Sequence, residues 1–330
     1  MKANLTTRFF GLELKSPVVA ASSSMTGNVD QIRKIADAGA GAIVLKSIFE
    51  EEIYHQLQEE LSRRNEFLSD PEYLDYFDYV IKDESLRKYV KLVSDAKAAA
   101  GVPVVASINC ATSNEWMAFA AKLQEAGADA LELNLFVAPS DYGKTGQDHE
   151  NFYFTVVDRV LRHVSIPVSI KISHYFSNLA GMVQKLSQTG VAGISLFNRF
   201  YAPDIDIAAE KVVAADVLSA DNEYLLPLRW TGILAGKTAC RLAGTTGIHT
   251  AETAVKFLLA GASAVQVASA LYQHGPAVVA DMNSGITRWM DEKGYASIDD
   301  FRGKLSLQNV GNATAWERVQ FMKYFGEKEF

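Results

Sequence analysis

The feature that most constrains this chain is a regular alternation of short β-branched runs with amphipathic helical stretches, along most of its 330 residues. The candidate strands are residues 17–21, 42–46, 104–109, 130–134, 168–172, 192–196, 241–244 and 264–267. The stretches with helical periodicity are residues 29–38, 86–99, 116–126, 152–163, 179–189 and 251–260. Such alternation implies parallel strand pairing with helices over the sheet. The sequence therefore predicts an α/β fold, and eight units favour a closed (β/α)₈ TIM barrel, with a doubly wound sheet as the alternative.

Boundary signals support this division of the chain. Thr112 and Glu115 have the spacing of a capping box, and Gly127, Gly190 and Gly261 follow predicted helix ends. No linker or low-complexity segment divides residues 1–330, so we expect a single barrel domain. Residues 47–82 form a long insertion after the second strand, where a barrel keeps a lid. A helical tail is expected beyond Tyr295.

Charge and cysteine content exclude several classes of protein. The net charge of -7 argues against nucleic acid or an anionic membrane surface as a partner. Two cysteines, Cys110 and Cys240, are too few for a disulfide framework or for an iron–sulfur cluster held by four cysteines of this chain. The amino terminus lacks the apolar core of a signal peptide, and no apolar run approaches about 18 residues. We expect a cytoplasmic protein.

Nearly every predicted strand ends on a polar residue, at the edge where TIM barrels carry their chemistry. These residues are Ser22, Ser23, Lys46, Ser47, Asn109, Cys110, Asn134, Lys171, Asn198, Arg199, Thr245, Thr246 and Ser269. Two are lysines at the ends of apolar runs, AIVLKS and PVSIKIS, and a buried lysine requires an anion or an electron-rich acceptor. A structural ion pair explains one such lysine, whereas two at the same mouth favour a functional site.

The last two strand ends have the composition of a phosphate site. AGTTGIHTAE and VQVASALYQHGP place small residues before a helix, where backbone N–H groups can approach an anion. With the two lysines, they predict a site for a phosphorylated planar cofactor or substrate. A lysine at the pyrimidine edge of a flavin would stabilise the charge of the reduced ring. The histidines (His55, His149, His163, His174, His249 and His274) lack metal-ligand spacing and are interpreted as surface or cap residues.

At these residues the chain resembles the dihydroorotate dehydrogenase family of FMN-containing barrels. The likeness runs through GLELKSPVVAASS, IVLKS, ASINC, ELNL, PVSIKIS, LFNRF, AGTTGI, HGPAVV and KGYASIDDFRGKLS. It implies FMN contacts at Ala21, Ser22, Lys46, Asn134, Lys171, Asn198, Gly244, Thr245, Gly247 and Ser269. Within this set it implies Lys171 at the pyrimidine edge, Asn134 and Asn198 as site amides, and a phosphate cradle from the last four residues. It also implies a homodimer.

Several positions depart from the family pattern. Val137 stands where the family has the cysteine or serine that removes a proton from dihydroorotate, and Pro139 replaces a substrate-binding asparagine. The family's lid motif has no counterpart in residues 67–79, and no Gly-Gly turn precedes the seventh helix. Thr246 and Ala268 stand where glycine is usual.

Three functional hypotheses follow. The first is an FMN-dependent oxidoreductase acting on the CH–CH group of a small anionic substrate, with hydride transfer to flavin N5. Lys46, Asn134, Asn198 and Arg199 would bind that substrate. The second is a flavin- or small-ligand-binding barrel that has lost the reaction. The third is dihydroorotate oxidation by an unfamiliar base, with Cys110 and the loop residue Ser140 as candidates.

Overall fold

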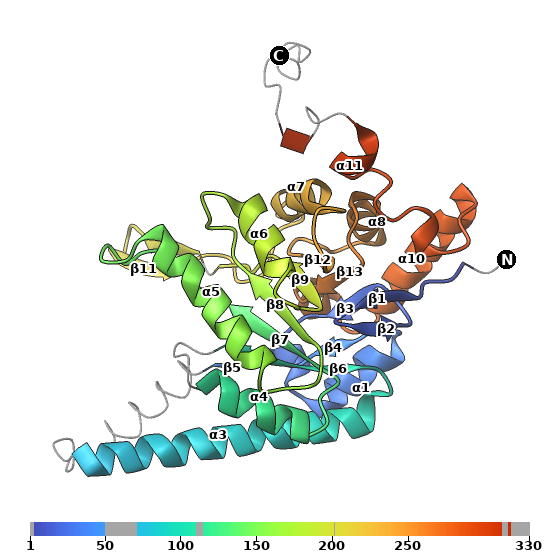
Figure 1. Cartoon of the computed structure of the whole chain (residues 1–330). Helices are drawn as coiled ribbons and strands as arrows, with labels where there is room; N and C mark the ends of the chain where they lie inside the picture. Colours follow the sequence, from blue (N-terminus) through green and yellow to red (C-terminus); the bar gives the residue numbers. More distant parts are fainter. Residues whose placement is uncertain (1–2, 50–70, 110–114, 201, 312–315, 318–330) are drawn as a thin grey trace.

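The computed structural model describes residues 3–49, 71–109, 115–200, 202–311 and 316–317, with only the backbone of residues 71–82 and 115. Eight parallel strands form a closed barrel, shown in Figure 1. They are β3 (Val18–Ala20), β4 (Ile43–Val44), β6 (Val104–Asn109), β7 (Ala130–Leu135), β8 (Val168–Ile172), β9 (Gly193–Leu196), β12 (Arg241–Thr245) and β13 (Ala264–Val267). Pairing of β4 with both β3 and β6 closes the ring. The predicted TIM barrel is therefore confirmed.

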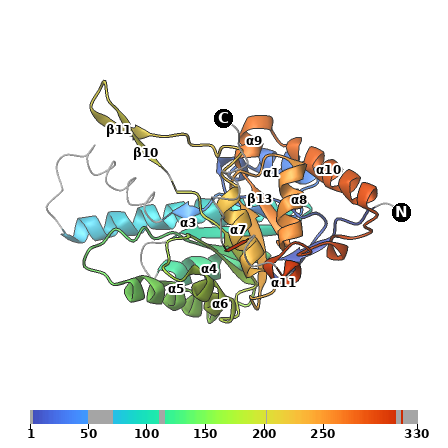
Figure 2. The ribbon, with the colours of Figure 1, turned by 90° about the horizontal axis from the view of Figure 1, so that it is seen from above.

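Helices cover the outside of the barrel (Figures 1 and 2). They are α1 (Val29–Asp37), α3 (Pro71–Ala100), α4 (Glu115–Glu125), α5 (Gly146–Leu161), α6 (Leu179–Ser187), α7 (Leu225–Leu234), α8 (Ala251–Ala260), α9 (Ser269–His274), α10 (Val278–Lys293) and α11 (Leu307–Val310). Gly127, Gly190 and Gly261 follow helix ends with φ of +94°, +101° and +119°, as their type predicts. Among the helices described, none is long and apolar enough to cross a membrane.

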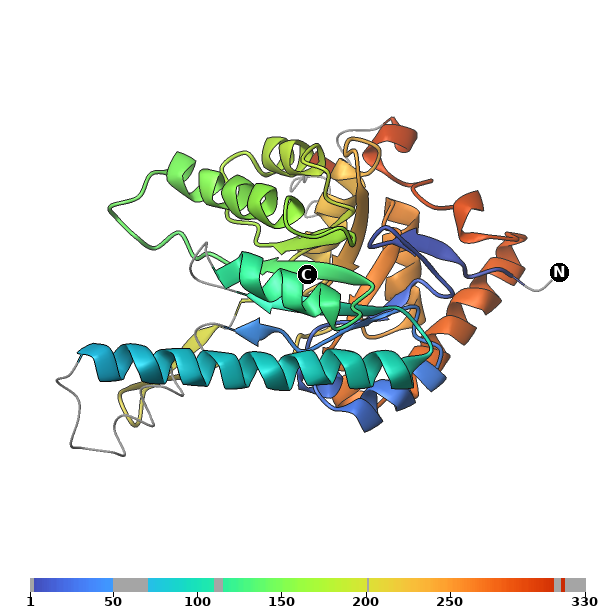
Figure 3. The same ribbon diagram turned by 60° about the horizontal axis from the view of Figure 1, so that its bottom comes forward.

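Two predicted helix starts are wrong. The helix expected from residue 86 begins at Pro71, so residues 71–82 of the expected lid belong to α3, which extends beyond the barrel in Figure 3. The helix expected from residue 152 begins at Gly146, because Thr145 and Asp148 form a capping box there. The rest of the expected lid contributes β5 (Ile48–Phe49), which pairs with β6; residues 50–70 lie outside the described part, as does Thr112.

The alternation of side chains along each strand separates the core into two parts. On β7, Leu131, Leu133 and Leu135 belong to the large core between barrel and helices, while Glu132 and Asn134 occupy the alternate positions. A hairpin of β1 (Thr7–Phe9) and β2 (Leu12–Leu14) joins the second, smaller core, in which Phe9, Phe10 and Leu14 pack with Val19, Val44, Val105 and Ala130. Apolar side chains therefore fill the interior near the amino ends of the strands.

A second hairpin, which the sequence interpretation does not include, lies between β9 and α7. Its strands are β10 (Pro203–Asp206) and β11 (Lys211–Ala214), and in the described chain they pair only with each other. Figure 2 shows this hairpin projecting away from the barrel. Every residue of both strands is exposed.

Candidate functional site

A cavity of about 570 Å³ lies where the predicted site residues converge, at the carboxyl ends of the strands. This size is within the usual range of small-molecule sites, about 300–1,000 Å³. The predicted residues that line it are Ala21, Ser22, Lys46, Asn134, Lys171, Asn198, Arg199, Thr245, Gly247 and Ser269. The fold thus brings together residues separated by almost 250 positions in the chain.

Three singled-out residues of the described part do not line this cavity. A Cβ on Gly244 would lie 2.1 Å from Cδ1 of Phe257, so close packing against α8 accounts for this glycine, and the structure gives it no place at the cavity. Val137 is half-buried and packs against the core, and Ser140 is exposed on the following loop. Cys110 lies outside the described residues.

The floor of the cavity is a buried polar network that connects four strands. Ser195 Oγ donates to Glu132 Oε2 at 2.9 Å, and Gln266 Nε2 donates to the same oxygen and to Ser195 Oγ. Gln266 Oε1 accepts a hydrogen bond from Lys171 Nζ at 3.1 Å. Glu132, Ser195 and Gln266 are at most 2% exposed. We name Glu132, Lys171, Ser195 and Gln266 the polar floor.

Two opposing effects act on the ammonium of Lys171. Burial lowers the pKa of Lys171 because water no longer solvates the charged form, and the nearby Glu132 carboxylate opposes that decrease. Perturbed groups of this kind gather at functional sites. Lys171 therefore has the position and the environment of a site cation.

The two predicted amides have different partners. Asn198 Nδ2 donates to the carbonyl oxygens of Lys171 at 3.1 Å and of Leu135 at 3.3 Å, so it ties the ends of neighbouring strands together. Asn134 Oδ1 is buried at the cavity with no hydrogen-bond partner among the described residues. An unpaired buried amide oxygen is unfavourable unless a ligand or water donates to it. Asn134 is therefore suited to a ligand that carries a donor.

The predicted phosphate turns meet at a serine that the sequence interpretation missed. Thr246 and Gly247 have φ of +70° and +67°, and the backbone N–H of Gly247 donates to Ser219 Oγ at 3.2 Å. The N–H of Ser219 in turn donates to Ser269 Oγ at 2.9 Å. Ser219 therefore links the turn after β12 to the start of α9, and it lines the same cavity.

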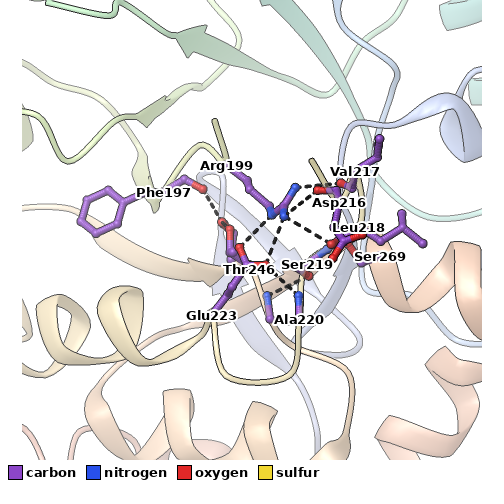
Figure 4. Close-up of polar contacts among 12 residues, drawn as sticks. Phe197, Arg199, Asp216, Val217, Leu218, Ser219, Ala220, Glu223, Thr246 and Ser269 are labelled. Atoms are coloured by element: carbon purple, nitrogen blue, oxygen red, sulfur yellow. Dashed lines mark hydrogen bonds and ion pairs between the residues drawn. The ribbon is translucent and has the colours of Figure 1, made fainter. Parts of the chain in front are cut away.

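Arg199 also lines the cavity, but its donors are directed to the segment that carries Ser219 (Figure 4). Nε and Nη2 donate to the two carboxylate oxygens of Glu223 at 2.8 and 3.1 Å. The carbonyl oxygens of residues 216–218 accept three further bonds at 2.8–3.2 Å. All three guanidinium nitrogens donate to this segment, so in this structure Arg199 anchors residues 216–223.

Two interpretations of single residues need correction. His249 is only 8% exposed and its Nε2 lies 3.1 Å from Ser219 Oγ, so of the two roles expected for the histidines, surface or cap, the surface role is wrong for His249. Glu132 was overlooked as a site residue, although the alternation in ELNL places it on the same strand face as Asn134. A carboxylate within an apolar strand was the available signal.

The residues at this cavity fit FMN at its pyrimidine end. Lys171 supplies a cation, and Asn134 supplies an unpaired acceptor that a ring N–H could satisfy. The turns joined by Ser219 lie in the same cavity and could bound a phosphate. The fit rests on these groups and on the volume of the cavity.

Comparison with known proteins identifies the family of this chain. The family profile "Dihydroorotate dehydrogenase" matches residues 81–290. The chain is 30% identical over 304 residues to "Dihydroorotate dehydrogenase B (NAD(+)), catalytic subunit" of Pyrococcus abyssi, covering 91% of this chain and 98% of that protein. It is 29% identical over 310 residues to the protein of the same name from Thermoplasma acidophilum, with the same two coverages. The chain belongs to the dihydroorotate dehydrogenase family.

Proposed function

We propose that this dihydroorotate dehydrogenase-family oxidoreductase is FMN-dependent and acts on the CH–CH group of a small anionic substrate. The observation that carries the proposal is Lys171, a lysine at the cavity floor on the strand next to Asn134, whose amide oxygen has no hydrogen-bond partner among the described residues. When bound, FMN would supply the chemistry by accepting a hydride at N5 from the substrate. The chain's own contribution is to hold the ring and to stabilise negative charge at its pyrimidine edge with Lys171.

The remaining residues have distinct roles in this proposal. Lys46, Asn134 and Asn198 lie at the ends of β4, β7 and β9, which are separated by β6 and β8, and they would orient the substrate over the ring. Thr245, Gly247 and Ser269 would form the phosphate end, with Ser219 as an added wall. Arg199 would act on the substrate only if residues 216–223 released its guanidinium. Ala21 and Ser22 would line the ring on the opposite side of the barrel mouth.

The substrate pocket differs from that expected for dihydroorotate. Val137 has no proton to exchange, and a positioned general base is typically worth about 10²–10⁴ in rate. Ser140 is exposed and near enough in sequence to approach the mouth if its loop moves. We therefore propose a substrate other than dihydroorotate, or one that ionises without a base at position 137.

A second candidate function is a flavin- or small-ligand-binding barrel that does not turn over. The packing of Val137 against the core favours it, since that side chain fills space and offers no chemistry. The two functions share the cofactor and differ in whether any substrate reduces it. We propose a homodimer for both, in line with the family resemblance.

The first test is the visible spectrum of the protein after incubation with FMN and removal of free flavin. A retained flavin band is expected, and Lys171→Met should weaken FMN binding by about tenfold or more, because a charge-assisted hydrogen bond is worth about 1.5–3 kcal/mol. Lys211→Met is the matched control, because Lys211 is exposed on the β10–β11 hairpin. Absence of a band in the unmodified protein would contradict the proposal. Bleaching of the band by a CH–CH donor would exclude the non-catalytic candidate.

A further inference from the structure

The polar floor contains a fully buried carboxylate, Glu132, for which the proposed function has no role. Glu132 is 0% exposed, and only its Oε2 is hydrogen-bonded, while Oε1 has no partner among the described residues. A buried carboxylate is strongly unfavourable unless an opposite charge compensates it. Lys171 on the adjacent strand β8 lines the same cavity as Lys46, and it is the cation whose pKa the Glu132 carboxylate raises.

The connection between the two charges runs through a single amide with a defined orientation. Gln266 Nε2 donates to Glu132 Oε2 and to Ser195 Oγ, so its carbonyl oxygen is turned toward Lys171. Ser195 Oγ donates to Glu132 and accepts from Gln266, which makes the reversed amide unfavourable. The network therefore aims an acceptor at Lys171 Nζ and determines where that nitrogen lies.

The charge of Lys171 is the property that such a network can control. Burial opposes the ammonium form, and the field of the Glu132 carboxylate supports it. Without that carboxylate, the half-buried lysine would face the cavity with only the neutral amide of Gln266 as a described hydrogen-bond partner. It would then lose its proton more readily.

We propose that Glu132 is a positioning residue that acts through Gln266 as the buried counter-ion of Lys171, holding the lysine protonated and aimed at the cavity. The inference rests on the proposed function only in naming a flavin as the group that Lys171 serves. Glu132 itself need not touch the ligand. Its effect would appear in the proton affinity of Lys171 and, through it, in the ease of flavin reduction.

The first arm of the test needs no flavin. Thermal unfolding midpoints are measured for Glu132→Gln, Lys171→Met and the double variant. Each single change should lower the midpoint. The midpoint of the double variant should be no lower than that of the less stable single variant, because neither charge is then left unpaired. Additive decreases would overturn the inference. This arm is unaffected if the protein binds no FMN.

The second arm follows the pH dependence of the flavin reduction potential in the FMN-loaded protein. Glu132→Gln should move the inflection that reports Lys171 at least one pH unit lower. Glu132→Asp keeps the charge, so its inflection should lie close to that of the unmodified protein. Ser169→Ala is the matched control: Ser169 is buried in the same barrel, and its hydroxyl has no partner among the described residues. An unchanged profile in Glu132→Gln would overturn the inference.

The two arms also separate this inference from the proposed function. If Lys171→Met leaves the potential unchanged while the unfolding cycle shows coupling, the flavin role of Lys171 is wrong and the counter-ion role stands. If Glu132→Gln fails to fold, both arms are run with Glu132→Met, which also removes the carboxylate and fills its volume with an apolar side chain. Additive midpoints or an unchanged pH profile in that series would then overturn the inference.

Discussion

The polar floor and the β10–β11 hairpin reverse the usual distribution of side chains in opposite ways. The floor places a carboxylate, an ammonium and two neutral polar groups inside a barrel. The hairpin places apolar side chains in solvent: opposite residues share a face, and one face carries Pro203, Ile205, Val212 and Ala214. Ile205 and Val212 are 66% and 74% exposed, whereas Glu132, Ser195 and Gln266 of the polar floor are at most 2% exposed.

The two regions differ in whether the chain itself supplies partners for these side chains. The floor satisfies most of its polar groups by mutual hydrogen bonds, and among its described side chains Glu132 Oε1 remains for a ligand or water. An isolated two-stranded hairpin is marginally stable in water, and this one has no described contact that covers its apolar face. The polar groups of the floor are therefore mostly satisfied within one chain, whereas the apolar face of the hairpin is covered by nothing in the described part of the chain.

The largest effect is expected from breaking the floor at its bridge. Gln266→Leu keeps the volume of the side chain and removes the acceptor of Lys171 and both donors to Glu132 and Ser195. Leaving buried charges without partners should lower the free energy of unfolding by about 3–5 kcal/mol, measured by urea denaturation. Val265→Ala on the same strand serves as a comparison, since it removes only apolar packing. A smaller loss in Gln266→Leu than in Val265→Ala would show that the floor is not a coupled unit.

The barrel was accessible from the sequence because its signals are local and repeated. Most strands are short apolar runs, many of them β-branched, and glycines such as Gly190 and Gly261 follow the ends of helices. The lysine ends of β8 and of the strand before Ser47 were recognised because a charge in an apolar run is unusual. The starts of α3 and α5 were predicted wrongly, although Pro71 and Glu72 are of types common in the first turn of a helix.

The partners of the site residues could not be predicted in the same way. Arg199 was expected to face a substrate, but its acceptors lie in residues 216–223, on the far side of a hairpin with no strong periodicity. The link between Lys171 and Gln266 spans 95 positions and depends on strand order around the ring. Such contacts follow from tertiary geometry, which local residue patterns do not contain.

The next largest effect should come from the apolar face of the hairpin. We expect Ile205→Asp with Val212→Lys to weaken self-association at least tenfold, about 1.4 kcal/mol, because both side chains would otherwise be covered in the proposed homodimer. Sedimentation velocity over a concentration series measures this change. Asp204→Asn with Lys211→Gln alters the opposite face and serves as the control. Equal association of all three proteins would place the dimer surface elsewhere.

The smallest effect concerns the anchor that joins the two regions. Arg199 follows β9 at the cavity mouth, and its bonds to residues 216–218 and to Glu223 hold the segment that returns from the hairpin (Figure 4). The Arg199 hydrogen bond is the main cause that lowers the pKa of Glu223 below its usual 4.5, although burial opposes it.

A carboxyl group whose pKa is lower in the folded state stabilises the protein above its unfolded pKa, and this stabilisation is lost as pH falls through the folded value. Glu223→Gln should therefore lower the free energy of unfolding by about 1 kcal/mol at neutral pH, because the pair is partly exposed, and by progressively less below pH 4.5. Urea denaturation at a series of pH values gives the difference between the two proteins. A difference that stays constant down to the acid limit would mean that Arg199 holds residues 216–223 through the backbone carbonyls alone, and the anchor would then not depend on charge.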